Sequence, residues 1–252
     1  GVSEAAILPV DTSIGSAGST SASRQTWMSG GAVLKACEAV VDALVLELQK
    51  EIGVEYERVG LNLVPKDSSD SIAIAVALRG RNFDEHVTHR HLPTFPLDHN
   101  GQGNAHVSFA FAAHRAVVDV DQELGLVRVV EIATSQDVGR ILNPVQARGQ
   151  IEGGVTQGLG LALLEELVLT DGKIANANFT DYLLPTAMDT PPIEIAAFIE
   201  QPEPGAPFGA KGIGEPPVIS STPAIVAAIR DATGFELNRV PVKPEDIALN
   251  GL

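Results

Sequence analysis

Five glycines interrupt a segment, residues 145–167, whose apolar spacing otherwise predicts a helix. They stand at positions 149, 153, 154, 158 and 160. A glycine inside a helix costs about 1 kcal/mol relative to alanine, so five in one helix need a compensating reason. Because glycine has no side chain, another backbone or a ligand can approach closely. The segment therefore predicts a buried helix in tight contact with a neighbouring backbone or a ligand.

Two other segments predict helices with clear ends. Apolar residues at three-to-four-residue spacing predict a helix over residues 32–52, and Gly53 stands where a C-terminal cap belongs. A second helix is expected over residues 222–234, since it starts with Thr-Pro and ends at a glycine.

Strand-like runs supply the rest of the regular structure, at residues 57–64, 71–78, 116–121 and 126–132. The last two alternate apolar and polar residues across a short loop, which predicts an antiparallel hairpin. Residues 79–103 are irregular and are interpreted as a long loop or a junction. We therefore expect an α+β fold with two mixed lobes, residues 1–100 and 101–252.

Composition excludes several classes of protein. The 252 residues carry 32 acids against 17 bases, a net charge of −15, which disfavours binding to the nucleic-acid backbone. No apolar stretch is long enough for a membrane helix, and no signal peptide is visible. The single cysteine, Cys37, cannot form an internal disulfide or ligate an iron–sulfur cluster, so a reducing cytoplasm is expected.

Two loops have the form of ligand-binding segments. Residues 12–23 contain eleven small Ser, Thr, Gly or Ala residues ahead of a predicted helix, which suits either an anion cradle or a flexible surface loop. Residues Gly209–Pro217 place Glu215 between a glycine and two prolines. A carboxylate on so rigid a turn suits a general base, although a Gly/Pro turn with an exposed glutamate is equally consistent.

All six histidines fall between His86 and His114. His86, His89 and His91 could ligate a transition metal, but no cysteine or acid lies at the spacing of a zinc motif. A histidine-rich surface loop is the favoured interpretation.

Four motifs together resemble the xanthine dehydrogenase/aldehyde oxidase family of molybdenum hydroxylases. They are the small-residue loop closed by Gly30–Val33, then Asp137–Pro144, then Gly149–Gly160 running into Leu164–Glu166, and finally Gly212–Pro217. Motifs in this order over some two hundred residues are far more specific than any one alone. Residues 1–64 and 101–234 carry the resemblance, whereas the stretch between them carries little of it.

The resemblance implies roles for individual residues. Glu215 matches the family's catalytic base, and the backbone of Ile213 and Gly214 would line the molybdenum site. Gln150 matches a glutamine that contacts the pterin cofactor. The small-residue loop would hold the phosphate end of the pterin, at positions Ala22, Ser23, Arg24 and Gln25. For the small-residue loop, a flexible surface loop stays open as the alternative.

The implied activity is hydroxylation of a substrate carbon with oxygen from water. The cofactor would be molybdenum–molybdopterin, with or without an added nucleotide, and two electrons would leave through iron–sulfur clusters and FAD on other segments or subunits. The family's large subunit is much longer, so the resemblance implies a C-terminal piece, inactive alone, that works with the remaining N-terminal part in a dimeric assembly.

The expected substrate is xanthine or another N-heterocycle, because residues 106–121 and 213–234 look most like the purine-oxidising branch. Two alternatives remain open. One is the aldehyde- or carbon-monoxide-oxidising branch of the same family. The other is a non-catalytic interaction module that keeps the fold but binds no cofactor.

Overall fold

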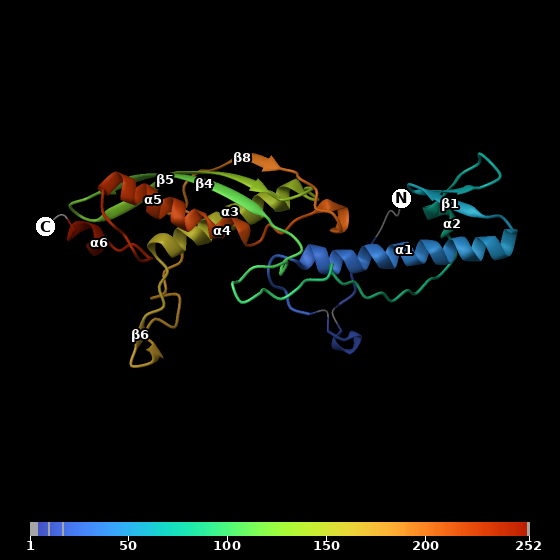
Figure 1. Ribbon diagram of the computed structural model, residues 1–252, viewed down its shortest axis with the longest axis horizontal. Coiled ribbons are helices and arrows are strands. Elements are labelled where there is room, and N and C mark those ends of the chain that lie inside the picture. The colour runs from blue at the N-terminus through green and yellow to red at the C-terminus, as the bar shows by residue number, and fades with distance from the viewer. Residues whose placement is uncertain (1–4, 10, 17, 251–252) are drawn as a thin grey trace. The chain divides into compact units, whose positions relative to one another are not determined.

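The structure of this protein is a computed structural model that describes residues 5–9, 11–16 and 18–250 (Figure 1). The chain forms two compact units. The first consists of Gly1–Thr20 and Gln25–His91, and the second of Ser21–Arg24 and Leu92–Leu252. The predicted lobes, residues 1–100 and 101–252, stay a prediction, since compactness alone does not show which parts fold independently.

The first unit is built around one long helix, α1 (Gln25–Ile52). The remaining elements of this unit are η1 (Thr12–Ile14), β1 (Tyr56–Val59), β2 (Asn62–Pro65), β3 (Ile72–Ala73) and α2 (Ile74–Ala77). Leu44 and Leu48 of α1 pack with Leu63 and Ile74 to form a small core. The helix begins at Gln25, before the predicted start at residue 32, and Trp27 on it is also buried.

The two predicted strands of this unit are corrected by the structure. Residues 57–64 hold most of a tight antiparallel hairpin, β1–β2, rather than one strand, because the chain turns at Gly60 with a φ of 62°. Residues 71–78 hold the two-residue β3 followed by α2. β-branched residues at 72, 74 and 76 favoured a strand in the sequence, but Ile74 and Ala77 lie three apart on a helix and both reach the core.

The second unit contains a three-stranded sheet in the order β4-β5-β8. The predicted hairpin is confirmed, since β4 (Phe111–Asp121) and β5 (Leu126–Asp137) pair antiparallel. The third strand, β8 (Ile193–Ile199), runs parallel to β5 and was not predicted. A separate small hairpin consists of β6 (Leu169–Thr170) and β7 (Lys173–Ile174).

Helices α3 (Pro144–Leu163) and α5 (Ser221–Thr233) lie along one face of the sheet (Figure 1). Three shorter helices are η2 (Pro207–Gly209), α4 (Pro216–Ile219) and α6 (Pro244–Ala248). Ile132 of β5, Ile151 of α3 and Ile225 of α5 are fully buried in one core. α5 ends at Gly234 in the left-handed conformation, as the sequence predicted.

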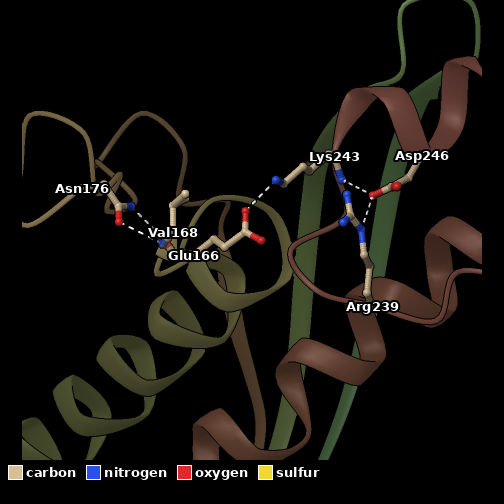
Figure 2. A network of polar contacts seen from close by, with 6 residues as sticks. All are labelled: Glu166, Val168, Asn176, Arg239, Lys243 and Asp246. Atoms are coloured by element: carbon tan, nitrogen blue, oxygen red, sulfur yellow. Dashed lines mark hydrogen bonds and ion pairs between the residues drawn. The ribbon is translucent and has the colours of Figure 1, made fainter. Parts of the chain in front are cut away.

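Polar contacts connect the end of α3 to the segment before α6 (Figure 2). Asn176 donates to the carbonyl of Glu166 at 2.7 Å and accepts from the backbone N–H of Val168 at 2.9 Å. The Lys243 ammonium lies 2.6 Å from Glu166 Oε2. Because this ion pair is partly exposed, we expect it to contribute little to the stability of the protein, although it joins the two segments.

Among the described residues, no helix is long and apolar enough to cross a membrane.

Candidate active site

One face of α3 packs against the segment that carries Glu215. A Cβ built on Gly154 would lie 2.7 Å from Pro217 Cβ. A Cβ on Gly158 would collide with Ser221 Oγ and lie 3.2 Å from the backbone nitrogen of Thr222. Residues four apart share a helix face, so Gln150, Gly154 and Gly158 form one row along α3. The predicted close approach is therefore confirmed at Gly154, which meets the Pro217 ring, and at Gly158, which meets the Ser221 side chain and the Thr222 backbone.

The prediction is wrong at two of the five glycines. Gly149 and Gly153 are exposed, and no described atom lies within 4 Å of a Cβ built on either. They fall on a different face of α3 from Gly154 and Gly158. Overpacking by a side chain at Gly153 is therefore not expected within the described part of the chain. The fifth, Gly160, is buried beside Glu165 and Pro185.

A tight turn of the small-residue loop brings Ser23 to Glu215. The backbone N–H of Arg24 donates to the Ser21 carbonyl at 3.3 Å, and between them Ala22 and Ser23 have φ values of 54° and 50°. Two successive non-glycine residues in this left-handed region are uncommon and strained. Ser23 Oγ accepts a hydrogen bond from the backbone N–H of Glu215 at 2.7 Å, and it lies 3.5 Å from Glu215 Oε2.

Gln150 and the glycine backbone complete this group. A Cβ built on Gly214 would lie 3.1 Å from Ser23 Oγ and 3.4 Å from Gln150 Oε1. A Cβ on Gly212 would lie only 2.8 Å from Ser23 Cβ. The structure thus brings together three motifs that are far apart in the sequence. Glycine at 212 and 214 is what allows the two loops to touch.

The remaining predicted site residues differ in burial and in the unit to which they belong. The Ile213 side chain is half-buried and packs against the core of the second unit. Ala22 is exposed and Arg24 is half-buried, on either side of Ser23. Gln25 begins α1 in the first unit, where its amide donates to Ser29 Oγ at 2.7 Å and accepts from Thr20 at 3.3 Å.

The Glu215 carboxylate is exposed and sits on a restrained backbone. Pro216 and Pro217 open α4 directly after it, and Pro217 is buried against Gly154. The two prolines fix φ, and the hydrogen bond to Ser23 holds the Glu215 amide. An accessible carboxylate held in this way can accept a proton from a group that is placed beside it.

A partly buried chain of polar contacts, which joins Ser220 to His114, Gln136 and Thr134, was missed in the sequence. His114 Nδ1 lies 2.7 Å from Ser220 Oγ, and its Nε2 lies 3.3 Å from Gln136 Nε2. Gln136 also donates to Thr134 Oγ1 at 2.7 Å. Burial lowers the pKa of His114, which keeps the imidazole neutral near pH 7. The period-two alternation of β4 was the available signal, since it turns residue 114 to the covered face.

The histidine-rich stretch does not assemble a metal site in the described part of the chain. No group of three His, Cys, Asp or Glu side chains there is arranged to hold a metal ion. His86 is exposed, whereas the ring nitrogens of His89 are buried. A Cβ on Gly31 would lie 2.5 Å from the His89 ring. Burial, with smaller contributions from Lys35 and His91, lowers the pKa of His89.

Comparisons with known proteins identify the class. The family of molybdopterin cofactor-binding domains matches residues 3–191, and the chain belongs to this family of the molybdenum hydroxylases. The match includes Ser23 and Gln150 and ends before Glu215.

Two curated relatives are similar over long stretches. The chain is 32% identical over 231 residues to the 6-hydroxypseudooxynicotine dehydrogenase complex subunit gamma of Paenarthrobacter nicotinovorans, covering 89% of this chain and 29% of that protein. It is 40% identical over 149 residues to a putative xanthine dehydrogenase molybdenum-binding subunit of Escherichia coli, covering 57% of this chain and 20% of that protein. The chain thus spans less than a third of the length of these relatives.

Solved structures agree on the fold. An aldehyde oxidoreductase from Desulfovibrio gigas aligns with a TM-score of 0.67 at 27% identity, over 92% of this chain and 23% of that one. A Cu,Mo-CO dehydrogenase aligns with a TM-score of 0.74 at 22% identity, over 92% and 30% of the two chains. The α+β architecture is therefore shared with molybdenum hydroxylases.

Two substitutions at Ser23 test the contact between the two loops. We expect Ser23→Ala to destabilise the chain by about 0.5–1.5 kcal/mol, because the Glu215 N–H loses its acceptor while the strained backbone remains. Ser23→Gly also removes the hydroxyl but tolerates a positive φ, which should recover about 0.5–1 kcal/mol. Urea unfolding of both variants measures the difference, and equal stabilities would contradict the strained turn.

Proposed function

We propose that this chain is the cofactor-binding, base-supplying part of a molybdenum hydroxylase and that Glu215 is its general base. The observation that carries the proposal is the convergence of Ser23, Gln150, Gly214 and Glu215 in one unit of the fold. A surface turn with an incidental glutamate needs no contact with two other motifs of the same family.

The residues present fit a molybdenum–pterin group. Gly212 and Gly214 let the backbone lie close to Ser23 and Gln150, whose side chains offer neutral donors and acceptors that suit the amide-like edge of a pterin. Arg24 follows Ser23 directly and suits an anionic phosphate. When bound, the cofactor supplies a Lewis acid that activates water and a redox centre that accepts two electrons.

The protein's own share of the chemistry is proton transfer and positioning. Glu215 would accept the proton that the water-derived nucleophile must lose as it attacks the substrate carbon. Ser23 and the two prolines hold the backbone of Glu215, so that the carboxylate meets its substrate in one orientation. A positioned general base of this kind contributes typically about 10²- to 10⁴-fold to the rate.

We further propose that the substrate is an N-heterocycle. Relatives named for xanthine and nicotine, both nitrogen heterocycles, are 36% and 37% identical to this chain over more than half of its length. A relative named for an aldehyde is 30% identical over 91% of this chain, and two named for carbon monoxide are 32% and 35% identical over 51% and 50% of it.

The proposed function also implies partners. Electrons would leave through iron–sulfur clusters and FAD on other segments or subunits of a dimeric assembly. A cytoplasmic location suits the single free, exposed Cys37.

The complete enzyme, purified with its partners, should hydroxylate N-heterocycles and hold one molybdenum for each copy of this chain. In ¹⁸O-labelled water, the product should carry the label, because the oxygen comes from water. The 252-residue chain alone should hold no molybdenum and show no turnover, since most of the relatives' length is absent from it. Turnover of aldehydes or carbon monoxide only would contradict the substrate class, and an assembly without molybdenum would contradict the proposed function itself.

A further inference from the structure

A buried ion pair joins the end of β5 to the loop that carries Glu215. Lys211 Nζ lies 2.6 Å from Asp137 Oδ2, and their side chains are only 6% and 9% exposed. Asp137 is the last residue of β5, and Lys211 precedes Glu215 by four positions in the same loop. Neither side chain has a role in the site as described so far.

The backbone on both sides of this pair is already fixed. The Lys211 N–H donates to the Val138 carbonyl at 3.0 Å, and the Arg140 N–H donates to the Gly209 carbonyl at 2.9 Å. Gly139, with a φ of 59°, permits the approach, because a Cβ there would lie 2.8 Å from the Lys211 nitrogen. Asp137 Oδ1 accepts from the Gly139 N–H at 3.2 Å, which orients the carboxylate toward Lys211.

A contribution to the stability of the fold does not by itself account for this pair. Removing two charges from water is costly, and a buried ion pair often stabilises a protein no more than apolar residues of similar volume would. The backbone hydrogen bonds hold the loop against β5 in any case. The ion pair restricts the position of the loop at Lys211, since a short bond between two buried charges is far less tolerant of displacement than apolar packing.

The other end of the segment is also fixed by a polar contact to the sheet. Ser220 Oγ lies 2.7 Å from His114 Nδ1, and His114 is a residue of β4. Residues between Lys211 and Ser220 are thus held at both ends, and Glu215 lies between them with its carboxylate exposed. Of these two contacts with the sheet, only the ion pair precedes Glu215, on the side of Gly212 and Gly214, which have no side chains of their own to anchor the backbone.

We propose that Asp137 and Lys211 are positioning residues, which set the backbone of Gly212–Gly214 and so the placement of the Glu215 carboxylate. This inference rests on the proposed function, because a position matters only if Glu215 acts on a bound substrate. Neither side chain touches the substrate. Their effect reaches the reaction through the loop.

The test uses the double variant D137N/K211M in the complete enzyme. It removes both charges together, keeps similar volumes, and leaves an amide oxygen at position 137 that can still accept from the Gly139 N–H. We expect the melting temperature and molybdenum content to stay close to wild type. The kcat per molybdenum should fall about 10- to 100-fold, the effect of a small misplacement of a catalytic group, while KM changes little. Hydrogen exchange should rise in residues 209–215 and stay unchanged in β5 and α3.

Two further variants separate positioning from folding. K211M alone leaves the Asp137 carboxylate buried without its partner and should lower the melting temperature, which the added D137N should restore without restoring kcat. The matched control is D119N/R128M, which removes an exposed ion pair of the same sheet, 62% and 76% exposed, and should change nothing. If the double variant does not assemble, Asp137→Glu keeps the charge balance and displaces the carboxylate by one methylene. It should lower kcat with KM unchanged.

Wild-type kcat and wild-type exchange in residues 209–215 of an assembled double variant would overturn the inference, as would wild-type turnover of Asp137→Glu. A fall in kcat that follows a general fall in melting temperature would also overturn it, since that is the behaviour of a merely structural pair. Failure of the proposed function is distinguishable, because it would leave Glu215→Gln active whatever the ion-pair variants do.

Discussion

Replacing Gly158 by alanine should destabilise the protein by about 1–3 kcal/mol through overpacking. The new Cβ would collide with Ser221 Oγ and lie 2.9 Å from Ser221 Cβ. Ser221 is fully buried and its hydroxyl donates to the Val218 carbonyl at 3.2 Å, so it cannot rotate away without losing that bond. Thr222 also donates to the Gly158 carbonyl at 2.8 Å, which holds α3 and α5 at this distance.

Gly153→Ala is the matched control, five residues earlier on the same helix. Gly153 is exposed, with no described atom within 4 Å of its Cβ position, so alanine should stabilise the helix by up to about 1 kcal/mol. Urea unfolding of the 252-residue chain measures both changes. Opposite signs are expected, and two changes of the same sign would contradict the close packing at Gly158 or the exposure of Gly153.

Replacing Glu215 by glutamine should remove turnover while leaving the fold and the cofactor content intact. Glutamine is nearly isosteric with glutamate, so it can stand between Gly214 and Pro216 without moving the backbone, and the hydrogen bond from its N–H to Ser23 remains. It cannot accept the proton that the nucleophile must lose. The expected loss is about 10²- to 10⁴-fold, the usual contribution of general-base catalysis.

Glu215→Asp provides the graded comparison. It keeps the carboxylate but shortens the side chain by one methylene, so a base remains at a displaced position. We expect an activity between those of the wild type and of Glu215→Gln, because misplacement of a catalytic group lowers a rate without abolishing the chemistry. An aspartate variant less active than the glutamine variant would argue against the charge as the essential feature.

The sequence predicted the elements with strong periodicity better than it predicted the connections between them. The β4–β5 hairpin, α3 and α5 each have an apolar pattern of one period, and all three are present. β8 was missed, since its short run lies among prolines and gains its pairing only from the distant β5. α2 was mistaken for a strand, because its β-branched residues favour a strand locally, whereas packing of Ile74 and Ala77 with Leu63 favours the helix.

The sequence predicted the site residues that belong to recognisable motifs, but not the contacts between them. Glycines mark a close approach without naming the neighbour, so Gly158 and Gly153 look alike in the sequence and differ in the structure. The contact of Ser23 with Glu215 joins residues 192 positions apart, which no local pattern encodes. The Asp137–Lys211 pair could not be predicted for the same reason, since the two residues lie 74 positions apart and only the fold brings them together.

The rate of the Glu215→Gln enzyme per bound molybdenum tests the central claim most directly. The complete assembly should contain as much molybdenum as the wild type and melt at the same temperature, yet turn over at least about 100-fold more slowly. If Glu215 has a structural role instead, metal content or stability will fall and the rate per molybdenum will be preserved. A rate within about tenfold of wild type, below the usual contribution of a base, would show that Glu215 is not the base.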